Sequence, residues 1–179
     1  MPPLMNPVNK YMHAFSVRPD VKFETQENDE EIILVLRAHP ITQISWGVNA
    51  IFLLVVLIVA NIFFTNFLSP VQLTYMSLMG VLFIMSYVWL NFLLYFFNVG
   101  IVTNKRIIDI DFYSILYREI SETRISKVED ITAKSAGYFG SLFNFGNVYV
   151  QTAGAEVNIE FESVPAPSEV VKIINDLQT

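Results

Sequence analysis

The sequence contains no cysteine and only two histidines, His13 and His39. Without thiols the chain can form no disulfide and has no thiolate to act as a nucleophile or metal ligand. Neither histidine belongs to an HExxH motif, and the chain contains no P-loop and no GxSxG motif. The sequence therefore predicts no catalytic residue, no cofactor and no metal site, and we expect a protein that is not an enzyme.

Positive charge is also scarce. The chain has 11 Lys and Arg against 17 Asp and Glu, a net charge of −6. Nucleic-acid binding needs a basic face that neutralises phosphates, so we expect no nucleic-acid partner. The first forty residues contain no apolar core of the kind that a removable signal peptide carries, so we expect none.

Charged residues are missing altogether from residues 38–104, where His39 is the only side chain that can titrate near neutral pH. Two apolar runs, residues 46–68 and 71–97, fill this block on either side of Ser69 and Pro70. About 20 residues of helix cross the hydrocarbon layer of a bilayer, and both runs are long enough. A buried helical pair in a soluble protein is the alternative, but such helices normally keep a polar face. We predict a transmembrane helical hairpin over residues 44–97.

Basic residues flank the predicted hairpin on both sides and are absent from its connecting loop at residues 66–75. The flanking residues are Lys10, Arg18, Lys22 and Arg37 before it, and Lys105, Arg106, Arg118 and Arg124 after it. Positive residues stay on the cytoplasmic side. We therefore predict a multi-pass protein of the cell (inner) membrane, with the lipid bilayer as a partner and both termini in the cytoplasm.

Two asparagines within the predicted spans, Asn49 and Asn91, are equally distant from Pro70. An antiparallel hairpin places them at similar depth, where an amide seeks a hydrogen-bonding partner worth about 1 kcal/mol. We predict an interhelical or intersubunit contact. The alternative is a polar path for an ion or substrate, although such paths usually contain a charged residue.

The residues before the hairpin divide into two parts. Residues 1–29 contain four of the eight prolines and no apolar period, which predicts an irregular tail. Residues 30–43 form a lead-in whose β-branched run, residues 32–36, predicts a strand or a short amphipathic juxtamembrane segment.

The pattern after the hairpin changes to a period of two. Strands are predicted at residues 99–103, 107–112, 116–122, 148–151 and 157–161, followed by an amphipathic helix over residues 168–177. Residues 124–131 place apolar side chains three apart, which suits a helical turn or a bulged strand. Asp109 and Asp111 share one face of a predicted strand, and we interpret them as solvated charge rather than a cation site.

An aromatic segment separates the predicted strands. Residues 137–146 combine three glycines with Tyr138, Phe139, Phe143 and Phe145. We interpret the segment as a loop or one-turn helix that plugs the sheet. The alternative is an apolar knob that contacts lipid or a protein partner, because exposed aromatic patches usually mark an interface.

Several short motifs follow one another in a fixed order along the chain: residues 30–31 and 36–40 before the spans, then residues 101–108, 125–131, 145–150 and 164–167. Their order and spacing resemble those of the bacterial pleckstrin-homology-like (PH-like) domains of small membrane proteins. The resemblance covers about residues 30–178. It implies an α+β membrane protein in which a two-helix transmembrane hairpin is followed by a PH-like antiparallel β barrel capped by a C-terminal helix. The cytoplasmic PH-like domain would occupy residues 98–179.

Three functions remain open at this point. We favour a non-enzymatic, membrane-anchored protein-binding or self-assembly module, with a homo-oligomer or an unknown protein as partner. One alternative is a channel or transporter subunit, with Asn49, Asn61 and Asn91 lining a path. The other is recognition of anionic lipid headgroups through Lys105, Arg106 and Arg118. Residues 99–179 carry seven Lys or Arg against eleven Asp or Glu, so their net charge of −4 opposes the last alternative.

Overall fold

The computed structural model describes residues 14–19, 23, 25–114, 117–135, 137–153 and 158–178. The chain divides into two compact units. The first, which we call the helical hairpin, is Pro40–Phe96. The second, which we call the sheet unit, comprises the residues up to His39 and those from Phe97 onward.

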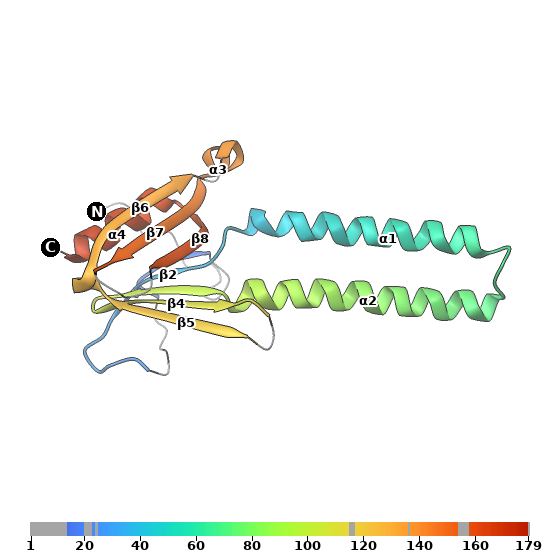
Figure 1. The fold of residues 1–179 in the computed structure, drawn as a ribbon, viewed down its shortest axis with the longest axis horizontal. Coiled ribbons are helices and arrows are strands. Elements are labelled where there is room, and N and C mark those ends of the chain that lie inside the picture. The colour runs from blue at the N-terminus through green and yellow to red at the C-terminus, as the bar shows by residue number, and fades with distance from the viewer. Residues whose placement is uncertain are drawn as a thin grey trace. The chain divides into compact units, whose positions relative to one another are not determined.

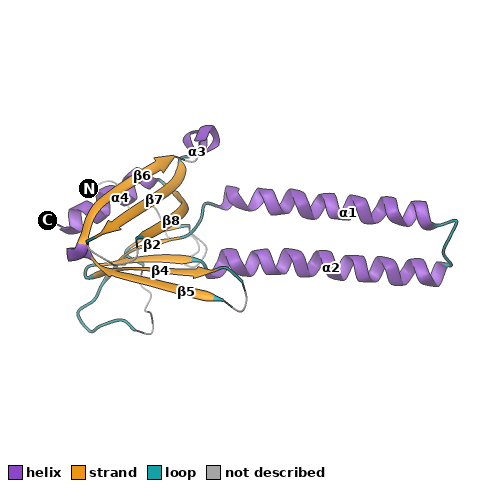
Figure 2. Ribbon diagram, viewed as in Figure 1, coloured by secondary structure: helices purple, strands orange, loops and turns teal. Residues whose placement is uncertain are grey.

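The helical hairpin contains a short 3-10 helix and two long α-helices (Figure 2). These are η1 (Pro40–Gln43), α1 (Ile44–Phe64) and α2 (Pro70–Phe97). Pro70 is the first residue of α2. A backbone N–H at this position has no acceptor within the helix, so proline loses no hydrogen bond there. Just before it, the Ser69 N–H donates to Gln72 Oε1 at 2.9 Å and the Gln72 N–H donates to Ser69 Oγ at 3.4 Å, which caps the helix reciprocally. The two predicted helices are confirmed, with α1 ending four residues early.

A small residue and one polar contact hold α1 against α2. A side chain at Gly80 would collide with Leu57, so glycine permits close approach of the two helices here. Ser77 Oγ donates a hydrogen bond to Asn61 Oδ1 across the hairpin at 2.7 Å.

The sheet unit consists of two antiparallel sheets (Figure 1). The first has the order β1 (Phe15–Val17), β2 (Ile32–Leu36), β3 (Val99–Thr103), β4 (Arg106–Phe112) and β5 (Arg118–Arg124). The second has the order β6 (Val128–Ser135), β7 (Phe145–Thr152) and β8 (Ile159–Pro165). Three helical segments complete the unit: η2 (Ile125–Lys127) between β5 and β6, α3 (Gly137–Phe143) between β6 and β7, and α4 (Pro167–Gln178) against β6 and β7.

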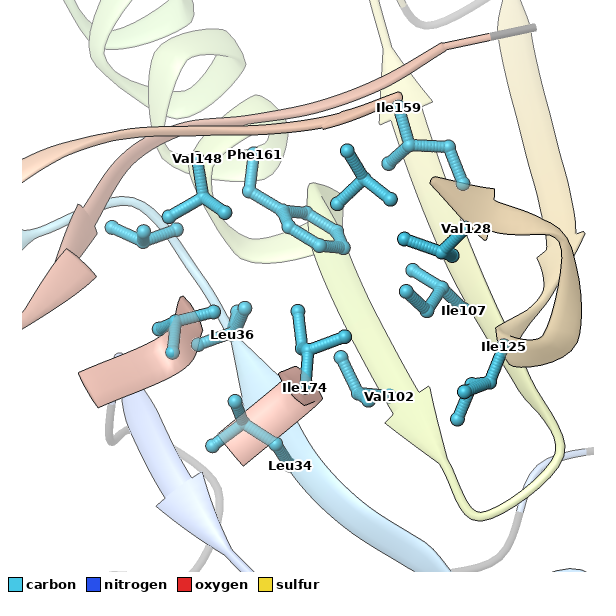
Figure 3. Packing of buried hydrophobic residues seen from close by; sticks show 13 residues of the cluster. Leu34, Leu36, Val102, Ile107, Ile125, Val128, Val148, Ile159, Phe161 and Ile174 are labelled. Atoms are coloured by element: carbon cyan, nitrogen blue, oxygen red, sulfur yellow. The ribbon is translucent and has the colours of Figure 1, made fainter. Parts of the chain in front are cut away.

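The main core lies between the two sheets and under α4 (Figure 3). Every second residue of a strand points inward. The buried set is Leu34, Leu36, Val102, Ile107, Ile125, Val128, Val148, Val150, Ile159, Phe161, Val164, Val170 and Ile174. Gly100 leaves room for the Phe161 ring, which would collide with any side chain at that position. A second, smaller cluster of Ile32, Ile101 and Ile108 covers the opposite face of the first sheet, with Phe23 packed on it.

The predicted antiparallel strands are confirmed, but they do not close into the predicted barrel. Among the described residues no ladder joins β5 to β6, and the eight strands form separate sheets of five and three. Figure 1 shows the sheets meeting where η2 links β5 to β6 and diverging from that corner. Alternation of apolar residues reports which strands have one buried face, but it does not report whether the outer strands pair with each other.

The structure also extends the folded unit beyond its predicted start at residue 98. The predicted strand at residues 32–36 is confirmed as β2, and it pairs with β3 through Leu36 and Gly100. β1 comes from the predicted tail and pairs with β2. The helical hairpin is thus inserted between two neighbouring, hydrogen-bonded strands.

The other predicted elements lie close to the observed ones. Residues 125–135 form η2 followed by β6, with a register irregularity between Val128 and Asp130, as the spacing of three suggested. α4 covers the predicted final helix. The strands predicted at residues 148–151 and 157–161 also imply a turn at residues 153–155, which lies mostly outside the described residues.

Candidate functional site

One end of the sheet unit, which we call the exit end, is where the chain leaves at His39 and returns at Phe97. Strand register fixes which other segments lie there. Val99 pairs with Ile110, and Phe112 pairs with Arg118, so the turn between β4 and β5 belongs to the exit end. The His39 N–H donates to the Ser163 carbonyl at 2.7 Å, which adds the end of β8.

α3 lies at the exit end as well. Ser135, the last residue of β6, pairs with Gly146 near the start of β7, and α3 connects these two strands. The ring of Phe145 stacks on that of His39 with centroids 5.4 Å apart. The sequence grouped Phe145 with the aromatic residues of α3, but Phe145 is only 8% exposed and belongs to the packed interior.

The remaining aromatic side chains of α3 do not plug the sheet. Tyr138 is 83% exposed and Phe139 67% exposed, and Phe143 is exposed beside them. Leu142, which the sequence analysis did not single out, is 65% exposed. These four residues, Tyr138, Phe139, Leu142 and Phe143, form what we call the α3 patch.

A second aromatic group lies between β4 and β5. Tyr113 and Tyr117 are exposed, with ring centroids 5.9 Å apart. Phe112, at the end of β4, packs against Phe97 at 5.5 Å. The sequence analysis missed both tyrosines because a turn signal says nothing about which end of a sheet the turn occupies. Strand register alone places them at the exit end.

The basic residues predicted to recognise a headgroup lie at both ends of the unit. Arg106 begins β4 at the far end and Lys105 directly precedes it, whereas Arg118 pairs with Phe112 at the exit end. Six residues of extended strand separate the two positions along β4, roughly 20 Å. The structure therefore does not bring the three side chains together.

Carboxylates already neutralise the two basic residues at the far end. Arg106 Nε and Nη2 each donate at 2.9 Å to Glu30, whose side chain is fully buried, and Arg106 Nη1 donates to Glu122 at 2.8 Å. Lys105 Nζ pairs with Glu27 at 2.8 Å on the surface. Burial alone would raise the pKa of Glu30. Hydrogen bonds from Arg106, the Glu27 backbone and Thr103 outweigh burial and lower that pKa to about 2.

The interpretation of Asp109 as solvated charge is wrong, because this residue is only 7% exposed. Asp109 shares the inward face of β4 with Ile107, which belongs to the main core. Burial, and then repulsion from Asp111, raise the pKa of Asp109 to about 8, and the pKa of Asp111 is raised as well. Protonation of Asp109 removes the repulsion between the two carboxyl groups.

The asparagines of the helical hairpin find partners at different places. Asn61 accepts the hydrogen bond from Ser77 on α2. Asn91 Nδ2 donates to the Tyr87 carbonyl of its own helix at 2.8 Å. The contact predicted between Asn49 and Asn91 stays a prediction. An apolar hollow of about 640 Å³ lies between Trp46 of α1 and residues 84–92 of α2.

Metal-ligating residues do not gather anywhere in the described part of the chain: no three His, Asp or Glu there are placed to hold a metal ion.

Comparison with known proteins identifies the family. The profile of the bacterial PH domain family matches residues 32–178, and the chain belongs to that family. No curated protein matches the sequence. Among solved structures, the chain is similar to a DUF1696-family protein with a pleckstrin-homology domain from Shewanella loihica PV-4. The identity is 16% and the TM-score 0.37, over 46% of this chain and 71% of that one.

Proposed function

We propose that this protein is a non-enzymatic, membrane-anchored PH-like module, held in the membrane by the helical hairpin and presenting the sheet unit at the cytoplasmic face. One observation carries the anchoring: by length and composition both helices could cross a membrane, and none of the described residues of α1 and α2 is buried. Helices that are apolar on every side need apolar surroundings.

The module binds proteins or other copies of itself through the outer edge of β5 around Ile120. Of the described strands only β4 pairs with β5, and most residues of β5 are exposed. An unpaired edge accepts another strand. Two copies anchored in one membrane present this edge at the same height, so contact between their β5 strands would bring together the two Ile120 side chains, which are half exposed.

A single-cysteine crosslinking experiment tests the assembly, because the chain has no cysteine of its own. Ile120→Cys in native membranes should give a disulfide-linked dimer on mild oxidation. Lys172→Cys, on the exposed face of α4, is the matched control and should stay monomeric. Monomer alone from Ile120→Cys, in a chain that remains membrane-bound, would reject assembly through β5 and leave the anchoring intact.

The two alternative functions have less support in the structure. A headgroup site needs free basic groups, and Lys105 and Arg106 are paired with carboxylates. A conducting path needs polar groups that face a lumen, and Asn61 and Asn91 bond within the hairpin.

A further inference from the structure

Two groups of exposed aromatic side chains flank the points where the sheet unit connects to the apolar helices. The α3 patch lies next to the His39 connection, because Phe145, two residues after α3, stacks on His39. Tyr113 and Tyr117 lie next to the Phe97 connection, because Phe112 packs on Phe97. Both placements follow from contacts within the sheet unit and from strand register.

We propose that the α3 patch and the tyrosines of the β4–β5 turn insert into the interfacial layer of the bilayer and hold the exit end of the sheet unit against the membrane. This inference rests on the anchoring proposed above. If the helices enter the bilayer right after His39 and leave it just before Phe97, the exit end lies at the membrane surface by covalent connection. Tyrosine and other aromatic rings favour that layer.

The composition of α3 fits a lipid surface better than water. Its seven residues contain no charge, and all four large side chains are exposed. α4 is the contrasting case, since it buries Val170 and Ile174 and carries its charged residues outward. An apolar segment shorter than two turns adds little to the folding of a water-exposed domain, whereas interfacial insertion would bury it by about 5–10 Å.

Spin labels on the full chain in phosphatidylethanolamine–phosphatidylglycerol vesicles test this proposal. Single cysteines replace Phe139, Leu142 or Tyr117, and Glu129→Cys, exposed near the far end of β6, is the control. At the three aromatic-region sites, the ratio of collisions with oxygen to collisions with a water-soluble nickel chelate should be several-fold higher than at Glu129→Cys. Far-UV circular dichroism confirms that each variant folds.

The fluorescence of the native tryptophans distinguishes a failure of this proposal from a failure of the proposed anchoring. Trp46 and Trp89 are the only two in the chain, and both lie in the helical hairpin. Suppose that brominated lipid quenches their fluorescence, but the ratio of oxygen to nickel-chelate collisions at Phe139→Cys is as low as at Glu129→Cys. This result overturns the docking of the exit end and supports the anchoring of the hairpin. Absence of quenching overturns both. A label at Phe139→Cys shielded from both reagents means that protein covers the patch, which also overturns the proposal.

Discussion

The helical hairpin and the sheet unit contain the same kinds of apolar residue and expose them to opposite extents. In the sheet unit Leu34, Val102 and Val148 have no exposed surface, and the core closes without help from other molecules. In α1 and α2, both described in full, no residue is buried, and Phe52 and Met79 are about two-thirds exposed. The sheet unit buries its own core, whereas the described residues leave the apolar side chains of the hairpin uncovered.

The largest difference in stability is expected between a phenylalanine replaced in the core of the sheet unit and one replaced on the exposed α3 patch. Phe161→Ala removes a ring packed between the sheets, and the cavity should destabilise the sheet unit by about 3–5 kcal/mol. Phe139→Ala, on the α3 patch, should change stability in detergent by less than about 0.5 kcal/mol. Amide hydrogen exchange of β3 and β7 in micelles reports the sheet unit separately from the hairpin. Equal losses in the two variants would contradict the division into core and exposed patch.

Breaking the Glu30–Arg106 pair should have the next largest effect. Glu30→Ala leaves the Arg106 guanidinium with the exposed Glu122 carboxylate and the Thr25 carbonyl as hydrogen-bonding partners, and we expect a loss on the order of 3 kcal/mol. Glu27→Ala, which removes the surface partner of Lys105, is the matched control and should cost nothing measurable.

The acid dependence of this pair follows from the lowered pKa of Glu30. A folded-state value of about 2 against the ordinary 4.5 means that the stabilisation is complete above pH 4.5 and is lost as the pH falls towards 2. Glu30→Ala should therefore reduce acid sensitivity in that window, and an unchanged acid profile would contradict the assigned ion pair.

How far the sequence predicted this fold depends on how local each feature is. The apolar helices and the alternating strands depend on neighbouring residues, and most of them were predicted, with ends that differ from the observed ones by up to four residues. β1 was missed because a strand of three residues is too short to show an alternating pattern. The pairing of β2 with β3 was left open, because β3 lies beyond an insertion of more than fifty residues. Such long-range pairing leaves little trace in local periodicity.

The candidate site shows the same limit. Tyr138, Phe139 and Phe143 were identified from composition, but only the fold separates them from Phe145. Asp109 was misread because both faces of β4 are covered, one by the second sheet and one by the small cluster that includes Ile108. A period of two cannot tell a solvated face from a second buried one.

The carboxyl groups of Asp109 and Asp111 on β4 should make the stability of the sheet unit depend on pH. Because the pKa of Asp109 is about 8 when folded and 3.8 ordinarily, the folded state retains a proton that the unfolded state loses. Stability should therefore fall as the pH rises above 4 and level off above 8, at a slope of at most about 1.4 kcal/mol per pH unit.

Asp109→Asn cannot ionise, and between pH 6 and pH 8 it should gain about 2 kcal/mol relative to the natural chain. Chemical denaturation at both pH values, followed by hydrogen exchange of β4, measures the difference. A gain that is independent of pH would show that Asp109 is not held protonated.

The smallest predicted effect concerns the contact between α1 and α2. Ser77→Ala removes the hydrogen bond to Asn61 and should weaken helix association by about 0.6 kcal/mol. Ser86→Ala is the control, because Ser86 donates to the Leu82 carbonyl of its own helix. Unfolding by dodecyl sulfate titration in mixed micelles compares the two variants, and equal losses would remove the special role of Ser77.

Single-cysteine topology mapping tests the central claim most directly, namely that the helical hairpin spans the membrane. Asn66→Cys places a thiol in the connection between α1 and α2, and Lys172→Cys places one on α4. In intact cells a membrane-impermeant maleimide should label Asn66→Cys at once and Lys172→Cys only after permeabilisation. Labelling of both sites from outside, or recovery of the chain in the soluble fraction after alkaline extraction, would contradict the account.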